Sequence, residues 1–527
     1  MGIYHRGVIE MLRKHSLRRT ISVLNFLLIA SLTSTTTYSE LSSSEVDFEL
    51  KLLGKYIFFD KISRPSRMAC ATCHDPDTGG TGSISGVNLH QVAITGADPH
   101  TTGALKPPTN AYASLVPPFH ECGLGGVRIG GFPTGAGYCG GNFWNGRAEG
   151  ADSPVLPGAT KHIGVEVFQG ADPGNPIWNY AIYFGGTSDQ ALNPMPNPVE
   201  QNIERQAVCE HVANAKYAEL YEIAWGETID CSEDEVSIVG ADVSSETKFD
   251  ISFKRMMLAI GAWQSSADLN SFSSRRDVAL RQELACFDAE YAEYYDAAVC
   301  KHADYLTSPG RFPLVGLTDQ ENLGHDLFYN TNFPPIPGRQ PPRTDLPTTN
   351  CSFCHLSESS SPDGTGVFER YTDDAYHNIG IPVNPLLPAD PDPGIAGHAE
   401  QSPLVDVGGF RTPTLRNVDK RKGKGFTKAY GHNGWFKSLE SIVHFYNTGK
   451  SKPFCESVIP YPGPFSEKDA LAFDCWPEPE WPQTVATPLL VGALGMSPDQ
   501  EAALVAYLKT LTDQETATPP KPYKSQK

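Results

Sequence analysis

Two Cys-x-x-Cys-His motifs, one in each half of the sequence, constrain this chain more than any other feature. They are Cys70-Ala-Thr-Cys73-His74 and Cys351-Ser-Phe-Cys354-His355. In this pattern the two thiols add across the vinyl groups of a haem, and the histidine becomes an axial ligand of its iron. The alternative is one zinc site built from both cysteine pairs, but zinc ribbons use a far shorter spacing between their pairs. The motifs therefore predict two covalently bound haem c groups.

The length and charge of the chain limit the number of its domains and the kind of partner that it can bind. Its 527 residues are enough for two or three domains with sizeable cores. With 61 Asp and Glu against 42 Lys and Arg, the net charge is −19. Such a surface argues against nucleic acid as a partner and favours either a basic protein partner or solubility alone.

The N-terminus has the composition of an export signal. A basic region holds Arg13, Lys14, Arg18 and Arg19, and the apolar run 21–32 follows it. Small and polar residues then lead to Ser39, so we predict a signal peptide over residues 1–39. The apolar run is short for about 30 Å of hydrocarbon, which leaves an uncleaved anchor as the alternative. No later segment is predicted to span a membrane.

Eight further cysteines form four couples that are close in sequence. We predict the disulfides Cys122–Cys139, Cys209–Cys231, Cys286–Cys300 and Cys455–Cys475. An unbroken helix through the third couple would separate its cysteines by about 21 Å, whereas a disulfide needs Cα atoms within roughly 7 Å. The third pairing therefore requires a turn. Disulfides form in oxidising compartments, so we expect a periplasmic protein, with the cell surface as the alternative.

The sequence divides near 308–313, and each side has a similar lead-in to its haem motif. Leu53-Gly-Lys-Tyr-Ile-Phe-Phe-Asp60 precedes the first motif, and Leu323-Gly-His-Asp-Leu-Phe-Tyr-Asn330 precedes the second. This weak repeat indicates two domains of one fold. We predict an N-terminal domain over 45–310, a C-terminal domain over 311–515 and a disordered tail over 516–527.

Helical periodicity predicts a mainly α fold. It is clearest in five segments, which are Ile203–Trp225, Phe249–Leu269, Ala279–Tyr295, Leu439–Tyr446 and Asp499–Thr512. Glycine- and proline-rich stretches at 76–142, 170–200 and 331–350 are predicted to be long ordered loops. No segment shows convincing β alternation.

Several motifs resemble the bacterial di-haem cytochrome c peroxidase and MauG family. They are Phe143-Trp-Asn-Gly-Arg-Ala148, Phe410-Arg-Thr-Pro-Thr-Leu-Arg-Asn-Val418, Tyr430-Gly-His-Asn-Gly434 and the closing Leu504-Val-Ala-Tyr-Leu-Lys-Thr-Leu-Thr512. The resemblance covers roughly residues 48 to 512 with large insertions. It implies two cytochrome c-like domains, each with one haem, and places Trp144 between the haems as a relay of electrons. A buried aromatic anchor is the alternative role, and the two are compatible.

The resemblance also implies an acid–base residue and a sixth iron ligand. Glu166 stands twenty-two residues after Trp144, near the position of the family's catalytic glutamate, and would move a proton between the oxygens of peroxide. The glutamine often found ten residues after the tryptophan is replaced by Pro154. Tyr446 stands fourteen residues after His432, where peroxidases carry methionine and MauG-like members carry a tyrosine ligand. His444 is a competing ligand.

Two further positions stay open. The loop after the first motif contains His90 and His100, and we expect the first haem to be five-coordinate or water-bound. The family holds calcium between its domains, and Thr427 and Ala429 match the positions that offer backbone carbonyls. The asparagine ligand of that site falls near Lys106, so calcium is left undecided.

These observations favour a MauG-like di-haem oxidoreductase that uses hydrogen peroxide at the His74 haem. It would share oxidising equivalents with a Tyr446-ligated second haem and draw electrons from a redox protein donor or a protein substrate. One alternative is an ordinary cytochrome c peroxidase that removes hydrogen peroxide. Another is a non-catalytic di-haem electron-transfer cytochrome.

Overall fold

Helices dominate the described part of the chain. The computed structural model describes residues 43–122, 137–150, 162–172, 174–238, 245–302, 313–331, 343–356, 366–387, 390–398, 407–486 and 491–525. The predicted signal peptide, Pro154 and most of the predicted domain boundary lie outside these ranges. Among the described residues, no helix combines the length and the apolar composition needed to cross a membrane.

The elements confirm the prediction of a mainly α fold. The α-helices are α2 (Ser43–Phe59), α3 (Cys70–Cys73), α4 (Ser85–His90), α5 (Gly186–Ala191), α6 (Arg205–Ala213), α7 (Ala218–Trp225), α8 (Lys248–Gln264), α9 (Arg275–Leu284), α10 (Ala297–Cys300), α11 (Asp319–Tyr329), α12 (Cys351–Cys354), α13 (Ile395–His398), α14 (Leu439–Thr448), α15 (Cys455–Val458), α16 (Glu467–Ala472) and α17 (Pro498–Lys509). The 3₁₀-helices are η1 (Pro76–Thr78), η2 (Ala113–Leu115), η3 (Val165–Phe168), η4 (Pro176–Tyr183), η5 (Ala289–Tyr294) and η7 (Pro482–Thr484). The described strands form three short antiparallel pairs, β1–β2 (His120–Glu121 with Tyr138–Cys139), β3–β4 (Glu235–Ser237 with Ser245–Thr247) and β5–β6 (Tyr376–His377 with Phe410–Arg411).

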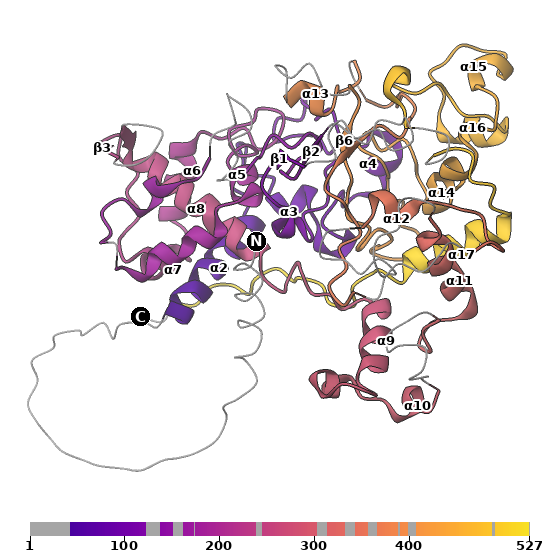
Figure 1. Cartoon of the computed structure of the whole chain (residues 1–527). Helices are drawn as coiled ribbons and strands as arrows, with labels where there is room; N and C mark the ends of the chain where they lie inside the picture. The colour runs from indigo at the N-terminus through magenta and orange to yellow at the C-terminus, as the bar shows by residue number, and fades with distance from the viewer. Residues whose placement is uncertain are drawn as a thin grey trace, which may run out of the picture. The chain divides into compact units, whose positions relative to one another are not determined.

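Helix α8 is the centre of a first hydrophobic core. Thr247 caps its N-terminus by accepting a hydrogen bond from the Asp250 backbone N–H. Its apolar side chains Phe253, Met256, Met257, Ile260 and Trp263 are buried, as are most of the helix's other side chains. Helices α2 and α6 pack against α8, and α7 packs against α2 (Figure 1).

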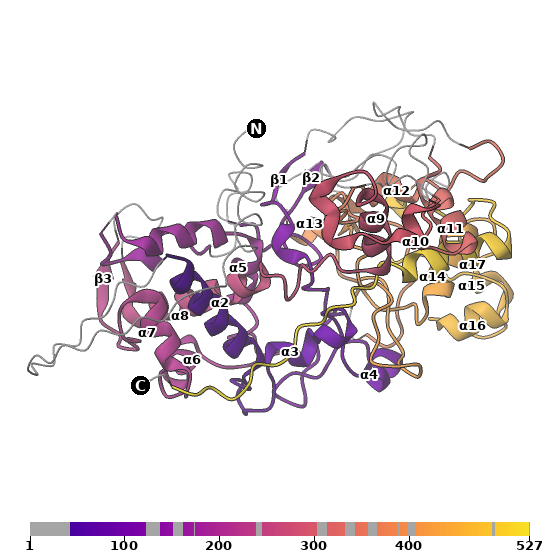
Figure 2. The same ribbon diagram turned by 90° about the horizontal axis from the view of Figure 1, so that it is seen from below.

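Helices α11, α14 and α17 build a second core. The closing helix α17 packs on both of the other two, and all three contribute buried residues such as Phe328, Val443 and Leu508 (Figure 2). The first core draws almost all of its residues from 50–269, and the second draws its residues from 328–511. The two cores therefore fall on opposite sides of the predicted sequence division.

The sequence repeat corresponds to a repeated packing contact. Gly54 of α2 lies against the backbone of α8, where a Cβ atom would be 1.9 Å from the carbonyl oxygen of Ala259. Gly324 of α11 lies against α17, where a Cβ atom would be 2.0 Å from the carbonyl oxygen of Ala503. Each lead-in helix thus uses its glycine to approach a second helix closely.

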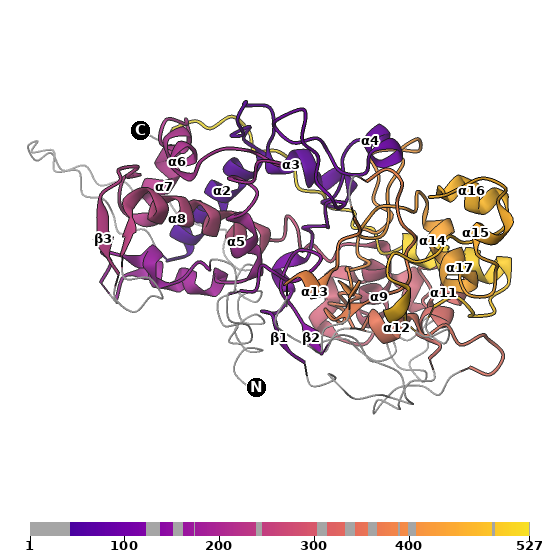
Figure 3. The same cartoon turned by 90° about the horizontal axis from the view of Figure 1, so that it is seen from above.

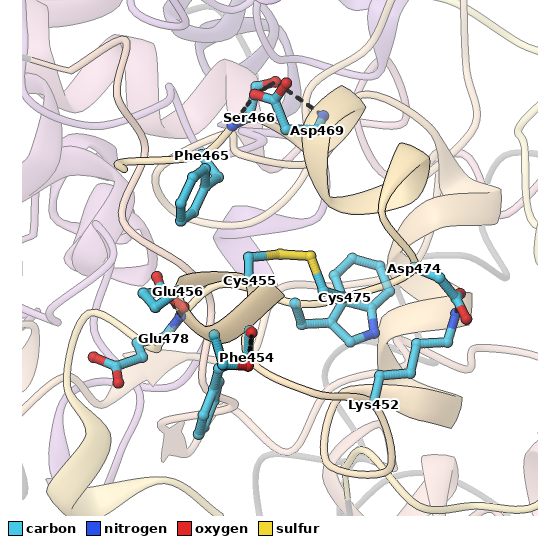
Figure 4. The surroundings of a disulfide bond; sticks show 12 residues. Lys452, Phe454, Cys455, Glu456, Phe465, Ser466, Asp469, Asp474, Cys475 and Glu478 are labelled. Atoms are coloured by element: carbon cyan, nitrogen blue, oxygen red, sulfur yellow. Dashed lines mark hydrogen bonds and ion pairs between the residues drawn. A yellow bond between two sulfur atoms is a disulfide. The ribbon is translucent and has the colours of Figure 1, made fainter. Parts of the chain in front are cut away.

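All four predicted disulfides are confirmed. Their Cα–Cα distances are 5.6 Å for Cys122–Cys139, 5.7 Å for Cys209–Cys231, 5.4 Å for Cys286–Cys300 and 5.0 Å for Cys455–Cys475. The segment predicted as one helix over Ala279–Tyr295 breaks after α9, which supplies the turn that the third pairing requires. Figure 4 shows the fourth disulfide, which joins the start of α15 to the residues after α16.

The segment after α17 differs from the predicted disordered tail. Residues 513–525 run in an extended conformation towards the first core, near α6 in Figure 3. Ala517 is buried in that core, and the Tyr56 hydroxyl donates a hydrogen bond to the carbonyl of Lys521. The Tyr523 ring packs edge-on against Tyr56. Aromatic and backbone contacts with distant residues hold the segment in place.

Candidate functional site

The two Cys-x-x-Cys-His motifs adopt the same local structure. Each pair of cysteines spans one turn of helix, α3 or α12, and the histidine follows at its C-terminal end. The Nδ1 atom of His74 lies 3.1 Å from the carbonyl oxygen of Gly80, and Nδ1 of His355 lies 2.8 Å from that of Tyr371. A hydrogen bond at Nδ1 fixes the ring and leaves Nε2 for a metal.

Among the described cysteines, the four of the haem motifs are the ones that form no disulfide. Their thiols are therefore free to form thioether bonds. Burial lowers the pKa of His74 and of His355, which favours the neutral imidazole that binds iron. Free thiols, oriented histidines and adjoining cavities all fit covalently attached haem.

A cavity adjoins each motif. We call the first the His74 cavity; its empty volume is about 1220 Å³, part of it open to solvent. Its wall includes Cys73, His74 and residues 103–110, which belong to a stretch predicted as an ordered loop. Neither His90 nor His100 lines it. The described residues therefore bring neither of these histidines to the first haem site.

We call the second the His355 cavity, with an empty volume of about 1750 Å³, also partly open to solvent. Cys351, Cys354 and His355 line it together with apolar side chains of α14 and α17. An apolar wall with a few polar groups is typical of a cofactor site.

Trp144 lines both cavities, as do Lys106, Thr109 and Arg411. The Trp144 indole is buried, and its Nε1–H donates a hydrogen bond of 2.7 Å to the carbonyl of Lys106. Its own carbonyl accepts a hydrogen bond from the backbone of Arg411. The indole that sequence analysis selected is thus held rigidly at the wall that the two cavities share.

One face of α14 points into the His355 cavity. This face consists of Leu439, Ile442, Val443 and Tyr446, a spacing that repeats with the helical period. His444 lies off this face: its Nδ1 is 3.0 Å from the Glu501 carboxylate, and its Nε2 is 2.7 Å from Lys452 Nζ. The structure therefore brings Tyr446, and not His444, to the cavity that contains His355. Burial raises the pKa of the Tyr446 phenol, so its anionic form depends on a nearby cation.

Glu166 lies on η3 and is not among the described residues of the His74 cavity wall. Its carboxylate is buried and ion-paired with Lys254 at 2.8 Å, and it also accepts a hydrogen bond from the backbone N–H of Gly164. Lys254 pairs with Glu246 as well. The catalytic role of Glu166 stays a prediction.

A different carboxylate, Glu200, lines the His74 cavity. Asn197 donates a hydrogen bond of 2.7 Å to it, and burial raises its pKa. A carboxyl group with a raised pKa can hold a proton nearer neutral pH, as a general acid does. Sequence analysis missed Glu200 because it lies outside the recognised motifs.

His432 lies in the motif Tyr430-Gly-His-Asn-Gly434, and the sequence predicted no role for its side chain. It lines the His355 cavity, stacks on Phe410 with ring centroids 3.5 Å apart, and lies 2.7 Å from the Glu480 carboxylate. Its ring also meets Trp144 edge-on at 6.4 Å. The Tyr-Gly-His-Asn-Gly motif was the signal that could have identified it.

The predicted calcium ligands do not form an oxygen-rich cage. The carbonyl of Thr427 accepts a hydrogen bond of 2.9 Å from the Asn88 amide. Lys428, which separates Thr427 from Ala429, has a buried ammonium group that donates to the carbonyls of Thr78 and Asn417. Calcium takes six to eight oxygen ligands, commonly including carboxylates. The described residues do not fit it.

The similarities to known proteins are consistent with a protein that binds two haems. The model of a family described as "Di-haem cytochrome c peroxidase" matches residues 49–285. "Methylamine utilization protein MauG" of Paracoccus denitrificans (strain Pd 1222) is 26% identical over 477 residues, which cover 89% of this chain and 89% of that protein. "Cytochrome-c peroxidase IdrP1" of Denitromonas iodatirespirans is 29% identical over 122 residues, 19% of this chain and 28% of that protein. The crystal structure of the diheme peroxidase BthA from Burkholderia thailandensis E264 aligns with a TM-score of 0.55 at 22% identity, over 89% of this chain and 87% of that chain, which is a likeness of fold.

Proposed function

We propose a MauG-like function for this chain. The chain belongs to the bacterial di-haem cytochrome c peroxidase and MauG family and is therefore a peroxidase-type di-haem oxidoreductase. His74 would hold the haem at which hydrogen peroxide would react, and Tyr446 would ligate a second haem that would share the oxidising equivalents. Each haem belongs to one cytochrome c-like domain, over residues 45–310 and 311–515. The electrons come from a redox protein or from a side chain of a protein substrate.

The haems, when bound, supply iron that reacts with peroxide and stores or passes electrons. Cys70, Cys73 and His74 would hold the first haem. Cys351, Cys354, His355 and Tyr446 would hold the second. Nδ1 hydrogen bonds to backbone carbonyls orient both histidines.

The presence of Tyr446 in the His355 cavity carries the proposal. A phenolate ligand stabilises oxidised iron, whereas a methionine thioether raises the potential and suits an electron collector. No methionine lines the described wall of this cavity. His444 does not line it either, and its ring forms hydrogen bonds with Glu501 and Lys452. These contacts favour the MauG-like function over the ordinary peroxidase.

Proton transfer at the His74 haem needs a carboxyl group within reach of peroxide. Glu200 lines the His74 cavity, while Glu166 is paired with Lys254. We therefore propose Glu200 as the acid–base group that the geometry supports, with Glu166 as the prediction from sequence. Trp144, which lines both cavities, would relay electrons between the haems.

Four disulfides support a periplasmic location, because such bonds persist in oxidising compartments. The signal peptide predicted over 1–39 agrees with export.

The test is to add hydrogen peroxide to the all-ferric holoprotein and follow its absorption and EPR spectra. We expect the ferric signals of both haems to change together. Reaction only after one-electron reduction would instead support an ordinary cytochrome c peroxidase. An unreactive protein would support a non-catalytic electron-transfer cytochrome.

A further inference from the structure

Two buried ammonium groups occupy the region where the family resemblance implies calcium. Lys106 Nζ donates hydrogen bonds to Thr81 Oγ1 at 3.0 Å and to the carbonyl of Pro107 at 3.2 Å. Lys428 Nζ donates to three carbonyls, those of Thr78, Asn417 and Lys420. The exposed fractions of Lys106 and Lys428 are 8% and 5%.

Within the described ranges, every polar contact of these two ammonium groups is to a hydroxyl or a carbonyl, and neither forms an ion pair with a carboxylate. Burying a charge is costly unless an opposite charge accompanies it. Among the described residues, no carboxylate lies within ion-pair distance of either ammonium group, and an anion would therefore complete the site.

Lys106 lies where it can influence both haem sites. Its side chain lines the His74 cavity and the His355 cavity, and its Nζ is 5.8 Å from the centroid of the Trp144 ring. Its carbonyl accepts the Trp144 indole N–H, and its backbone N–H donates to the carbonyl of His432 at 2.9 Å. Lys106 thus forms hydrogen bonds with the Trp144 indole and with the backbone of His432, and its ammonium group lies beside the Trp144 ring.

We propose that the ammonium group of Lys106 takes the place of calcium between the two haem sites, where it pairs with haem carboxylates. This inference rests on the proposed function because it requires both haems. Haem c keeps two propionate carboxylates after its vinyl groups have reacted with cysteine, so it carries the anion that the site lacks. Lys428 adds a second positive charge beside the predicted calcium ligands and repels a divalent ion.

The first experiment uses the unmodified holoprotein. The protein is equilibrated with calcium, desalted and analysed for metal content, and its absorption and EPR spectra are recorded before and after treatment with a chelator. We expect far less than one calcium per chain and no spectral change. One calcium per chain, with spectra that change when it is removed, overturns the inference.

The second experiment measures the midpoint potentials of both haems in Lys106→Met, Lys106→Arg and the surface control Lys509→Met. Removing a nearby positive charge favours the ferric state, so we expect Lys106→Met to lower both potentials. Lys106→Arg should keep them close to those of the unmodified protein, as should Lys509→Met, which removes only an exposed ion pair with Glu440. Equal potentials in Lys106→Met and in the control overturn the inference.

Haem content separates this inference from the proposed function. Fewer than two haems per chain in the unmodified protein, measured by the pyridine haemochrome absorbance, contradicts the two-haem function itself. Two haems together with bound calcium contradicts only the role of Lys106. If Lys106→Met does not fold, the calcium measurement on the unmodified protein still decides.

Discussion

At the scale of single residues, the helical period of α14 explains why Tyr446 lines the His355 cavity and His444 does not. Successive residues of a helix are rotated by about 100°, so two positions apart they point to different sides. Tyr446 shares its face with Leu439, Ile442 and Val443, and His444 instead meets Glu501. Replacing Tyr446 by Phe removes the proposed ligand oxygen and should change the low-spin ferric EPR signal of one haem while both haems are retained.

His444→Gln is the matched control on the same helix, and we expect it to leave that EPR signal unchanged. If Tyr446→Phe leaves the spectrum as it is, Tyr446 is not a ligand. A changed spectrum in His444→Gln alone would assign the ligand to His444.

Glu200 and Glu166 are the two candidates for the acid–base group of the peroxide reaction, and substitutions can distinguish them in the same way. Glu200→Gln keeps the size of the side chain but removes its acid–base chemistry, so we expect the peroxide reaction to slow by about 10²- to 10⁴-fold. Glu166→Gln should leave that rate nearly unchanged and lower stability by about 1–3 kcal/mol, because it weakens the buried contact with Lys254. Stopped-flow absorption and thermal unfolding measure the two effects. The reverse pattern would restore Glu166 as the catalytic residue.

At the scale of elements, the paired glycines test whether the sequence repeat is a structural one. A methyl group at Gly54 or Gly324 would collide with the backbone of the facing helix, α8 or α17. Overpacking of this kind typically costs about 1–3 kcal/mol. We therefore expect Gly54→Ala and Gly324→Ala each to lower the free energy of unfolding by that amount, measured by denaturant titration with circular dichroism.

Gly86 of α4 provides the matched control, since a Cβ atom there meets nothing within 4 Å. Gly86→Ala should be neutral or raise stability by about 0.4–1 kcal/mol, because alanine restricts the unfolded chain. Equal effects at all three glycines would mean that close helix packing is not what these positions require.

At the scale of the whole molecule, a buried ion pair joins segments on the two sides of the predicted domain boundary. Asp277 of α9 accepts hydrogen bonds of 2.7 and 3.0 Å from the Arg416 guanidinium, and both side chains are fully buried. Burial alone would raise the pKa of Asp277, but the charges of Arg416 and Arg276 and the hydrogen bond from Ser274 outweigh it and hold this pKa well below its usual value. The pair links α9 to the motif that begins at Phe410.

Because folding lowers the pKa of Asp277, the free energy of unfolding depends on pH. A carboxyl group whose pKa falls on folding stabilises the protein above its unfolded pKa of about 3.9, and this contribution is lost as pH falls towards the folded pKa. Asp277→Asn leaves the Arg416 charge buried, so we expect a loss of about 3–5 kcal/mol at pH 7. The difference between variant and unmodified protein should shrink below about pH 4, as measured by denaturant titrations across pH. A difference that does not change with pH would contradict the assigned ion pair.

Some parts of this protein could be predicted because their signals are local. The haem motifs, the helical periodicity around α8, α14 and α17, and the four cysteine couples all lie within short segments. The extended segment over 513–525 could not be predicted, since its composition gives no sign of the contacts with Tyr56 and the first core. Likewise, Glu166 was predicted from its distance in sequence from Trp144, whereas only the folded structure shows that Glu200 lines the His74 cavity.

The sequence by itself determined the chemistry that is available: two haem attachment motifs, an oxidised set of cysteines, and a tyrosine at a ligand position. Tertiary structure alone decided which groups meet. It placed Trp144 and Lys106 at both cavities, turned His444 away from the iron site and paired Glu166 with Lys254. The physical reason is that covalent motifs and helix faces depend on neighbours in sequence, whereas a shared wall and buried charges depend on contacts between residues far apart in the chain.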